Sequence, residues 1–208
     1  MSLKSEMGQS PLKSVFLVIV ISFFVSGCIT SNVVGNVDEI VSSYEKPSGT
    51  LPIKFTLFGT EKLRFYSRFI SATCGARDFV YNFSQTAQKT ANSILQRKFR
   101  FANPAENVTR VEFYITGMTP YLDCHRGILS TICQGSVSIL GTVAMTSRTG
   151  VVNSAKISAT SDRTDGSRSG LCSAPADQAE KNFASAYRQI LNLVTIITRE
   201  FIAANKPL

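Results

Sequence analysis

The chain has 208 residues, with 22 lysines and arginines against 14 acidic residues, a net charge of +8, no tryptophan and a single histidine. This length fits one domain with a real core, and the charge balance favours anionic partners. The sequence contains no nucleotide-binding, hydrolase or metalloprotease motif, so we expect no enzyme, no catalytic residues, no cofactor and no metal.

An apolar stretch near the N-terminus comes first in chain order. Residues 15–25 read VFLVIVISFFV, follow two lysines, and end in the tetrapeptide Val25-Ser26-Gly27-Cys28. As a helix this stretch spans roughly 16 Å, about half of a hydrocarbon core. It therefore suits an export signal better than a membrane span.

The tetrapeptide Val25-Ser26-Gly27-Cys28 resembles the lipobox of bacterial lipoprotein precursors, which reads aliphatic, small, small, Cys. The resemblance implies that residues 1–27 are a signal peptide and that Cys28 becomes the first mature residue, carrying acyl chains such as palmitate. Ile29 rather than Asp follows, which by that family's sorting habit implies the outer membrane of the cell envelope, with a domain facing the periplasm. The alternatives are an ordinary secretory signal with an incidental Cys28, or an uncleaved anchor helix.

The first half of the mature chain shows two patterns. Residues 28–50 are rich in Ser, Gly and Asn, and we expect a flexible tether leading to a single α+β domain at 51–208. Alternating apolar residues predict a strand at 51–57, and a turn then leads into a second alternating stretch at 63–69, together a possible hairpin. The period becomes helical over 76–99, with a helix start near Cys74.

The second half predicts a meander and a long helix. Apolar alternation at 110–116, 137–145 and 151–159 indicates three strands, the first two joined by a loop bounded by Cys124 and Cys133, and the last two by a turn at 147–150. A helical stripe predicts the final helix: Phe183, Tyr187, Ile190, Val194, Ile197 and Phe201. The expected fold is α+β, an antiparallel or mixed sheet of four to five strands with two helices on one face.

The cysteines indicate disulfides at one rim of the domain. With Cys28 assigned to lipid, an even set remains: Cys74, Cys124, Cys133 and Cys172. In an oxidising compartment, four remaining cysteines indicate two disulfide bonds. The strand directions place all four at one rim, so we expect Cys124–Cys133 and Cys74–Cys172, with the other pairings open. A zinc site that includes His125 is the alternative.

Arginines gather near the same rim and predict a site for an anion or a partner. These are Arg77, Arg126, Arg163 and Arg168. Guanidinium groups bind phosphate and carboxylate groups well. The alternative interpretation is that these arginines are solvated loop charges without a ligand. In an exported protein, anionic lipid is a better candidate than nucleic acid, from which we expect no binding.

The element order across residues 51–205 is similar to that of small envelope lipoproteins of the LptE, YajG and PqiC types. That resemblance implies a non-enzymatic outer-membrane lipoprotein that is an accessory or assembly subunit of an envelope complex, with anionic lipid as a candidate ligand. Two alternatives remain open. One is a structural subunit of a secretion, pilus or motor complex, and the other is a free lipoprotein that binds lipid or cell wall.

Overall fold

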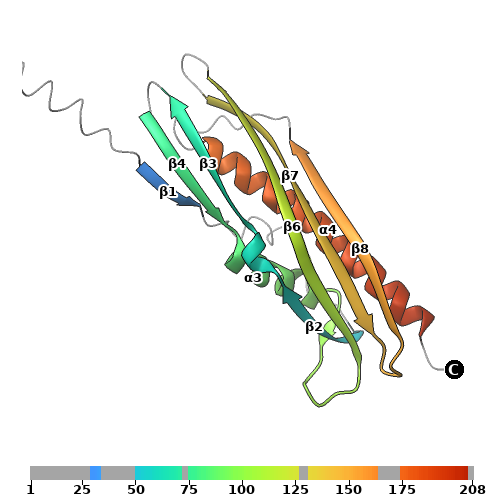
Figure 1. The fold of residues 1–208 in the computed structure, drawn as a ribbon. Coiled ribbons are helices and arrows are strands. Elements are labelled where there is room, and N and C mark those ends of the chain that lie inside the picture. The colour runs from blue at the N-terminus through green and yellow to red at the C-terminus, as the bar shows by residue number, and fades with distance from the viewer. Residues whose placement is uncertain (1–28, 34–49, 72–74, 127–130, 164–173, 206–208) are drawn as a thin grey trace, which may run out of the picture.

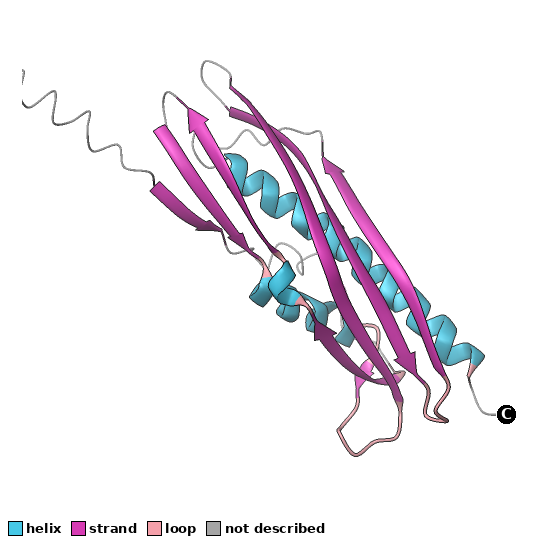
Figure 2. Ribbon diagram, in the orientation of Figure 1, coloured by secondary structure: helices cyan, strands magenta, loops and turns pink. Residues whose placement is uncertain are grey.

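A computed structural model describes residues 29–33, 50–71, 75–126, 131–163 and 174–205. In this part of the chain two sheets and two helices form, and the longer helix lies along the larger sheet (Figures 1 and 2). The larger sheet contains β2 (Pro52–Phe58), β5 (Arg100–Phe101), β6 (Thr109–Arg126), β7 (Thr131–Thr146) and β8 (Val152–Arg163). The remaining elements are β1 (Ile29–Val33), β3 (Arg64–Ser71) and β4 (Gly75–Asn82) of the smaller sheet, η1 (Thr60–Lys62), α3 (Ser84–Gln96) and α4 (Ala174–Ala204).

The larger sheet has the order β5-β2-β6-β7-β8 and mixed strand directions. Strand β2 runs parallel to both of its neighbours, whereas β6, β7 and β8 form the predicted antiparallel meander. The predicted turn between β7 and β8 is present, with Gly150 at φ 89° and the Ser147 N–H donating to the Val151 carbonyl at 2.8 Å. The predicted α+β class, with a mixed sheet of up to five strands, is confirmed.

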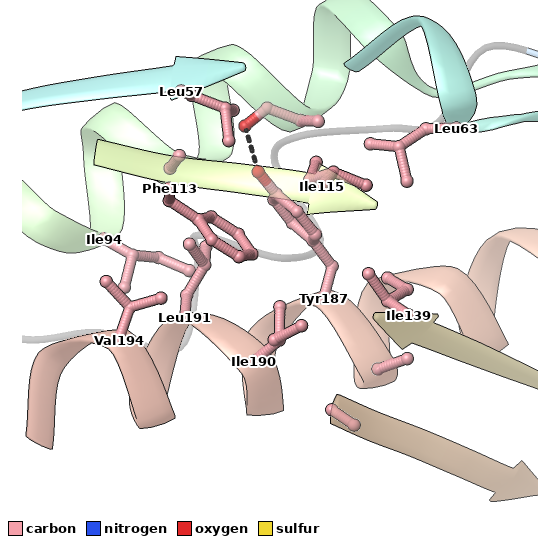
Figure 3. Close-up of a cluster of buried hydrophobic side chains, with 14 of the residues drawn as sticks. Leu57, Leu63, Ile94, Phe113, Ile115, Ile139, Tyr187, Ile190, Leu191 and Val194 are labelled. Atoms are coloured by element: carbon pink, nitrogen blue, oxygen red, sulfur yellow. Dashed lines mark hydrogen bonds between the residues drawn. The ribbon is translucent and has the colours of Figure 1, made fainter. Parts of the chain in front are cut away.

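One face of this sheet carries the core, and both helices cover it. Val111, Phe113 and Ile115 of β6 are buried, as their alternation predicted. Tyr187 of α4 is fully buried between the helices, and its hydroxyl donates to the Ala87 carbonyl of α3 at 3.0 Å (Figure 3). The predicted stripe of α4 points into this core, with these side chains buried: Phe183, Tyr187, Ile190, Val194 and Phe201.

Strand β6 extends beyond the predicted strand at 110–116, and strand residues occupy both ends of the predicted loop bounded by Cys124 and Cys133. Strand β6 continues to Arg126 and pairs with β7 along this whole length. A bulge between Ile115 and Gly117 absorbs the break in the alternation. Pro120 is tolerated because β2 pairs with β6 only as far as Tyr114, so beyond that point no described strand needs a donor from this side of β6.

The predicted start of the first helix near Cys74 is wrong. Residues 75–82 form β4, which pairs antiparallel with β3, and α3 begins at Ser84. Phe79 and Tyr81 alternate with half-buried neighbours, and the Tyr81 ring stacks on Phe65 of β3 at 4.1 Å between centroids. Since Phe79 and Phe83 are four residues apart, the same side chains satisfy both a strand period and a helical one.

Two expectations for the N-terminal part are also wrong. Residues 29–33 of the expected tether form β1, which pairs parallel with β4. Strands β2 and β3 do not form a hairpin, because η1 intervenes and β3 enters the smaller sheet. Gly59 starts this change of direction at φ 77°, and a Cβ there would overlap the Ile115 carbonyl, so only glycine fits.

Candidate functional site

The predicted cysteine end of the molecule is built around the β6–β7 hairpin. Cys124 and Cys133 are cross-strand partners with Cα atoms 4.0 Å apart, and a disulfide joins them. This is the pairing that their short separation predicted. The bond removes two thiolates from the alternative zinc site. Cys28, Cys74 and Cys172 lie outside the described residues, so lipidation and the second bridge stay predictions.

The strand ends place the predicted arginines around this hairpin. Arg126 ends β6 opposite Thr131, and Arg163 ends β8 opposite Gly135. Arg77 lies near the start of β4, which is at the same end of the molecule (Figure 1). The backbone alone is described at these three positions, and Arg168 lies outside the described residues.

Beneath the hairpin, α4 places two fully buried amides that the sequence did not reveal. Gln178 Nε2 donates to Asn182 Oδ1 at 3.1 Å, while Gln178 Oε1 and Asn182 Nδ2 have no hydrogen-bond partner among the described residues. The Asn182 side chain fits here because Gly135 has no Cβ. A Cβ on residue 135 would be 3.1 Å from Asn182 Nδ2 and 2.5 Å from the Tyr121 carbonyl oxygen. The pair offers one buried acceptor and one buried donor close to the disulfide. Gln and Asn count as polar in a hydropathy pattern, so only the tertiary structure identifies them as buried.

Several side chains have shifted pKa values, and each shift has a structural cause. Burial raises the pKa of Tyr81 to about 12 and also raises the pKa of Tyr187. Hydrogen bonds from the Arg100 guanidinium and from the Asn103 N–H lower the pKa of Glu106 to about 2. The two tyrosines stabilise the core, and Glu106 fixes the loop that follows β5.

At the opposite end of the sheet, two hollows flank the C-terminus of α4. The first has a volume of about 360 Å³, and its lining includes Leu51, Asn107, Val108, Arg148, Ile202 and Asn205. The second, of about 410 Å³, lies between α4 and the β7–β8 hairpin, and its lining includes Val151, Val152, Ile197, Glu200 and Phe201. Each hollow is assembled from segments that are far apart in the chain, so no local motif signals it.

The described part of the chain contains no helix long and apolar enough to cross a membrane. Among the same residues no cluster of three or more His, Cys, Asp or Glu side chains has the geometry to hold a metal ion.

Comparison with known proteins gives weak likenesses to solved structures. No protein-family model matches the chain, and no curated protein matches it. A Xanthomonas campestris protein of the DUF330 family is 10% identical, with a TM-score of 0.45 over 82% of this chain and 97% of its own. A minor lipoprotein from Acinetobacter baumannii is 12% identical, with a TM-score of 0.36 over 75% of this chain and 95% of its own. A Helicobacter pylori homolog of a neuraminyllactose-binding hemagglutinin is 12% identical, with a TM-score of 0.34 over 73% of this chain and 83% of its own. At these TM-scores the likenesses carry no argument.

Proposed function

We propose that this chain is an outer-membrane lipoprotein whose domain faces the periplasm and acts by binding, as an accessory or assembly subunit of an envelope complex. The observation that carries the proposal is the tetrapeptide Val25-Ser26-Gly27-Cys28 behind an apolar stretch of signal-peptide length. Acyl chains contribute about 0.8 kcal/mol per buried methylene, so two or more of them hold a protein on a bilayer without a spanning helix.

The position of β1 supports attachment close to the membrane. This strand begins at Ile29, the residue after Cys28, and pairs with β4 so that Ile29 lies opposite Arg77. An acylated Cys28 is therefore one residue away from the smaller sheet. Most of the full chain's net charge of +8 lies after residue 27, and a positive domain suits the anionic headgroups found at such a surface.

Acylation is tested by labelling cells with a radioactive or alkyne-tagged fatty acid. Cys28→Ala should lose the label and leave uncleaved or mislocalised precursor. The matched control is Ser26→Ala, which keeps a small residue in the tetrapeptide and should be labelled and processed normally. Continued labelling of the Cys28→Ala protein would contradict the proposed anchor.

Binding of an anionic ligand at the cysteine end is a second, narrower proposal. It is supported by the direction of β6 and β8, which both end at the cysteine end of the sheet with Arg126 and Arg163 as their last residues. Reversing Arg126, Arg163 and Arg168 to Glu should weaken binding to vesicles containing an anionic lipid, and the difference should shrink as salt is added.

A matched control reverses three exposed cations elsewhere, namely Lys62, Arg110 and Arg148. This control changes the net charge equally, so it should bind vesicles better than the rim variant does. Equal loss in both variants would mean that net charge alone drives binding. An unchanged rim variant would exclude the cysteine end as the anion site.

A further inference from the structure

Strand β8 is a long edge of the larger sheet. It pairs with β7 along its whole length, from Val152 opposite Thr146 to Arg163 opposite Gly135, without a register shift. No described strand lies on its other side (Figure 1). On that side the N–H and C=O groups of alternate residues point away from β7. Its 12 residues make an edge of roughly 40 Å.

The two edges of this sheet are protected very differently. The edge strand β5 has only two residues, and Arg100 on it is tied to Glu106 by a bidentate ion pair with N···O distances of 3.1 and 2.6 Å. Soluble proteins commonly protect long edges with proline, bulges or several charges. Strand β8 has no proline and no bulge, and Lys156 is the single charged residue between 153 and 161.

An apolar groove lies beside the start of β8. It has a volume of about 410 Å³ and separates the β7–β8 hairpin from the last turns of α4, with Val152, Ile197 and Phe201 in its lining. Val151 and Val152 at its mouth are 49% and 70% exposed. Glu200 is the single charged residue among the described residues that line the groove, and its carboxylate favours a cation there.

We propose that β8 is a strand-addition site for an extended segment of a partner protein, with apolar side chains on its helix-facing side and a basic residue near Glu200. The free backbone groups of β8 match only another extended backbone, and the groove accepts its alternate side chains. The negative local charge selects a basic rather than an acidic segment. The inference rests on the proposed role in an envelope complex and names the surface through which the partner is bound.

A synthetic peptide is the probe, used with the purified full chain in detergent. It has about nine residues, alternates Val with Thr and carries Lys at one end, which is an ordinary strand length. Two derivatives carry N-methyl groups on alternate amides, one on the odd and one on the even set. The proposal predicts that one derivative binds like the parent peptide and that the other binds at least about tenfold more weakly, since only one set faces β8.

Paired protein variants test the groove. Val151→Asp with Val152→Asp should weaken the parent peptide at least about tenfold, whereas Ser154→Asp with Ser158→Asp adds the same charge on the open face of β8 and should change binding less than about threefold. The single Val151→Asp replaces the double variant if circular dichroism shows that the double variant fails to fold, because Val151 lines the groove whereas Val152 shares its side of β8 with Ser154 and Ser158. Hydrogen exchange of the outward-facing amides among residues 153–161 should slow when the parent peptide is added, whereas the alternate amides already bond to β7.

Three results would overturn the proposal. The first is equal binding of both N-methylated derivatives, or no binding of the parent peptide. The second is slow exchange of the outward-facing amides among residues 153–161 in the free monomer, which would mean that the edge is already covered. The third is a dimer of the free chain that the Val151→Asp, Val152→Asp variant dissociates, because the occupant would then be a second copy. None of these results affects fatty-acid labelling of Cys28, so the anchor and the strand-addition site can fail separately.

Discussion

Gly141 of β7 is the position where the packing of the core makes the sharpest stability prediction. It lies opposite Ile115 on β6, and the ring of Phe113 covers it. A Cβ at Gly141 would overlap Phe113 Cε2 and would lie 3.0 Å from both Phe113 Cζ and the Tyr114 carbonyl oxygen. Phe113 is fully buried, so its ring has no room to move aside.

Gly141→Ala should therefore destabilise the fold by the cost of overpacking, about 1–3 kcal/mol. For a chain of this size each kcal/mol lowers the melting temperature by about 2–4 °C, so calorimetry should find a fall of about 2–12 °C. The matched control is Gly117→Ala in the bulge, where a Cβ has no atom within 4 Å and the change should stay within about 0.5 kcal/mol.

A double-mutant cycle identifies the cause of the loss. Phe113→Leu removes the ring that the new methyl group meets, so Phe113→Leu combined with Gly141→Ala should cost less than the sum of the two single changes. Two results would show that Phe113 does not pack over Gly141 as described. One is an equal melting temperature for Gly141→Ala and Gly117→Ala, and the other is strict additivity of the losses caused by Phe113→Leu and Gly141→Ala.

Three further predictions address the disulfide, the loop after β5 and the contact between the helices. Cys124→Ser with Cys133→Ser should lower the free energy of unfolding by roughly 2–3 kcal/mol in chemical denaturation, given the sequence separation of 9 in the closed loop, and an unchanged midpoint would contradict a structural role. The pKa of Glu106 is about 2 in the folded chain against an ordinary value of 4.5, so its stabilisation is fully present above about pH 4.5 and is lost as the pH falls through 2. Glu106→Gln should therefore flatten the dependence of the free energy of unfolding on pH across that range. An unchanged dependence would show that the ion pair with Arg100 does not stabilise the fold. Tyr187→Phe should cost about 1 kcal/mol in thermal melts by removing the buried bond to α3, and a melt that matches wild type would show that this bond adds nothing.

Long, regular patterns predicted the fold correctly. The stripe from Phe183 to Phe201 repeats over many turns and has Pro175 in its first turn, so α4 was predictable from period and start signals together. The strands β6, β7 and β8 alternate with few exceptions where they face the core, and Gly150 marks the turn between the last two. In these elements local propensity and tertiary burial agree.

Predictions failed where one set of residues fits two structures. Phe79, Tyr81 and Phe83 are compatible with a strand that continues into a helix, and only the pairing of β4 with β3 separates the two elements. The predicted strand ended at residue 116, before Gly117 and Pro120, yet a bulge and a side of β6 that no described strand pairs with accommodate both residues within the strand. Both outcomes depend on partners that are distant in the chain.

The candidate site was predictable only in part for the same reason. The short separation of Cys124 and Cys133 indicated their bridge. The burial of Gln178 and Asn182 depends on space that Gly135 leaves on another element, and the groove beside β8 depends on how α4 crosses the sheet. No local pattern carries that information.

The proposed function of the chain is that of a lipid-anchored binding subunit of an envelope complex. The most direct measurement is the mass of the wild-type protein after extraction from envelope membranes in mild detergent, by size-exclusion chromatography with light scattering. We expect it to elute with other envelope proteins, at a protein mass well above that of one mature chain, which is below the 22.7 kDa of the full 208 residues. Elution as a single chain in a detergent micelle, at every detergent concentration that keeps known envelope complexes intact, would contradict the proposed function.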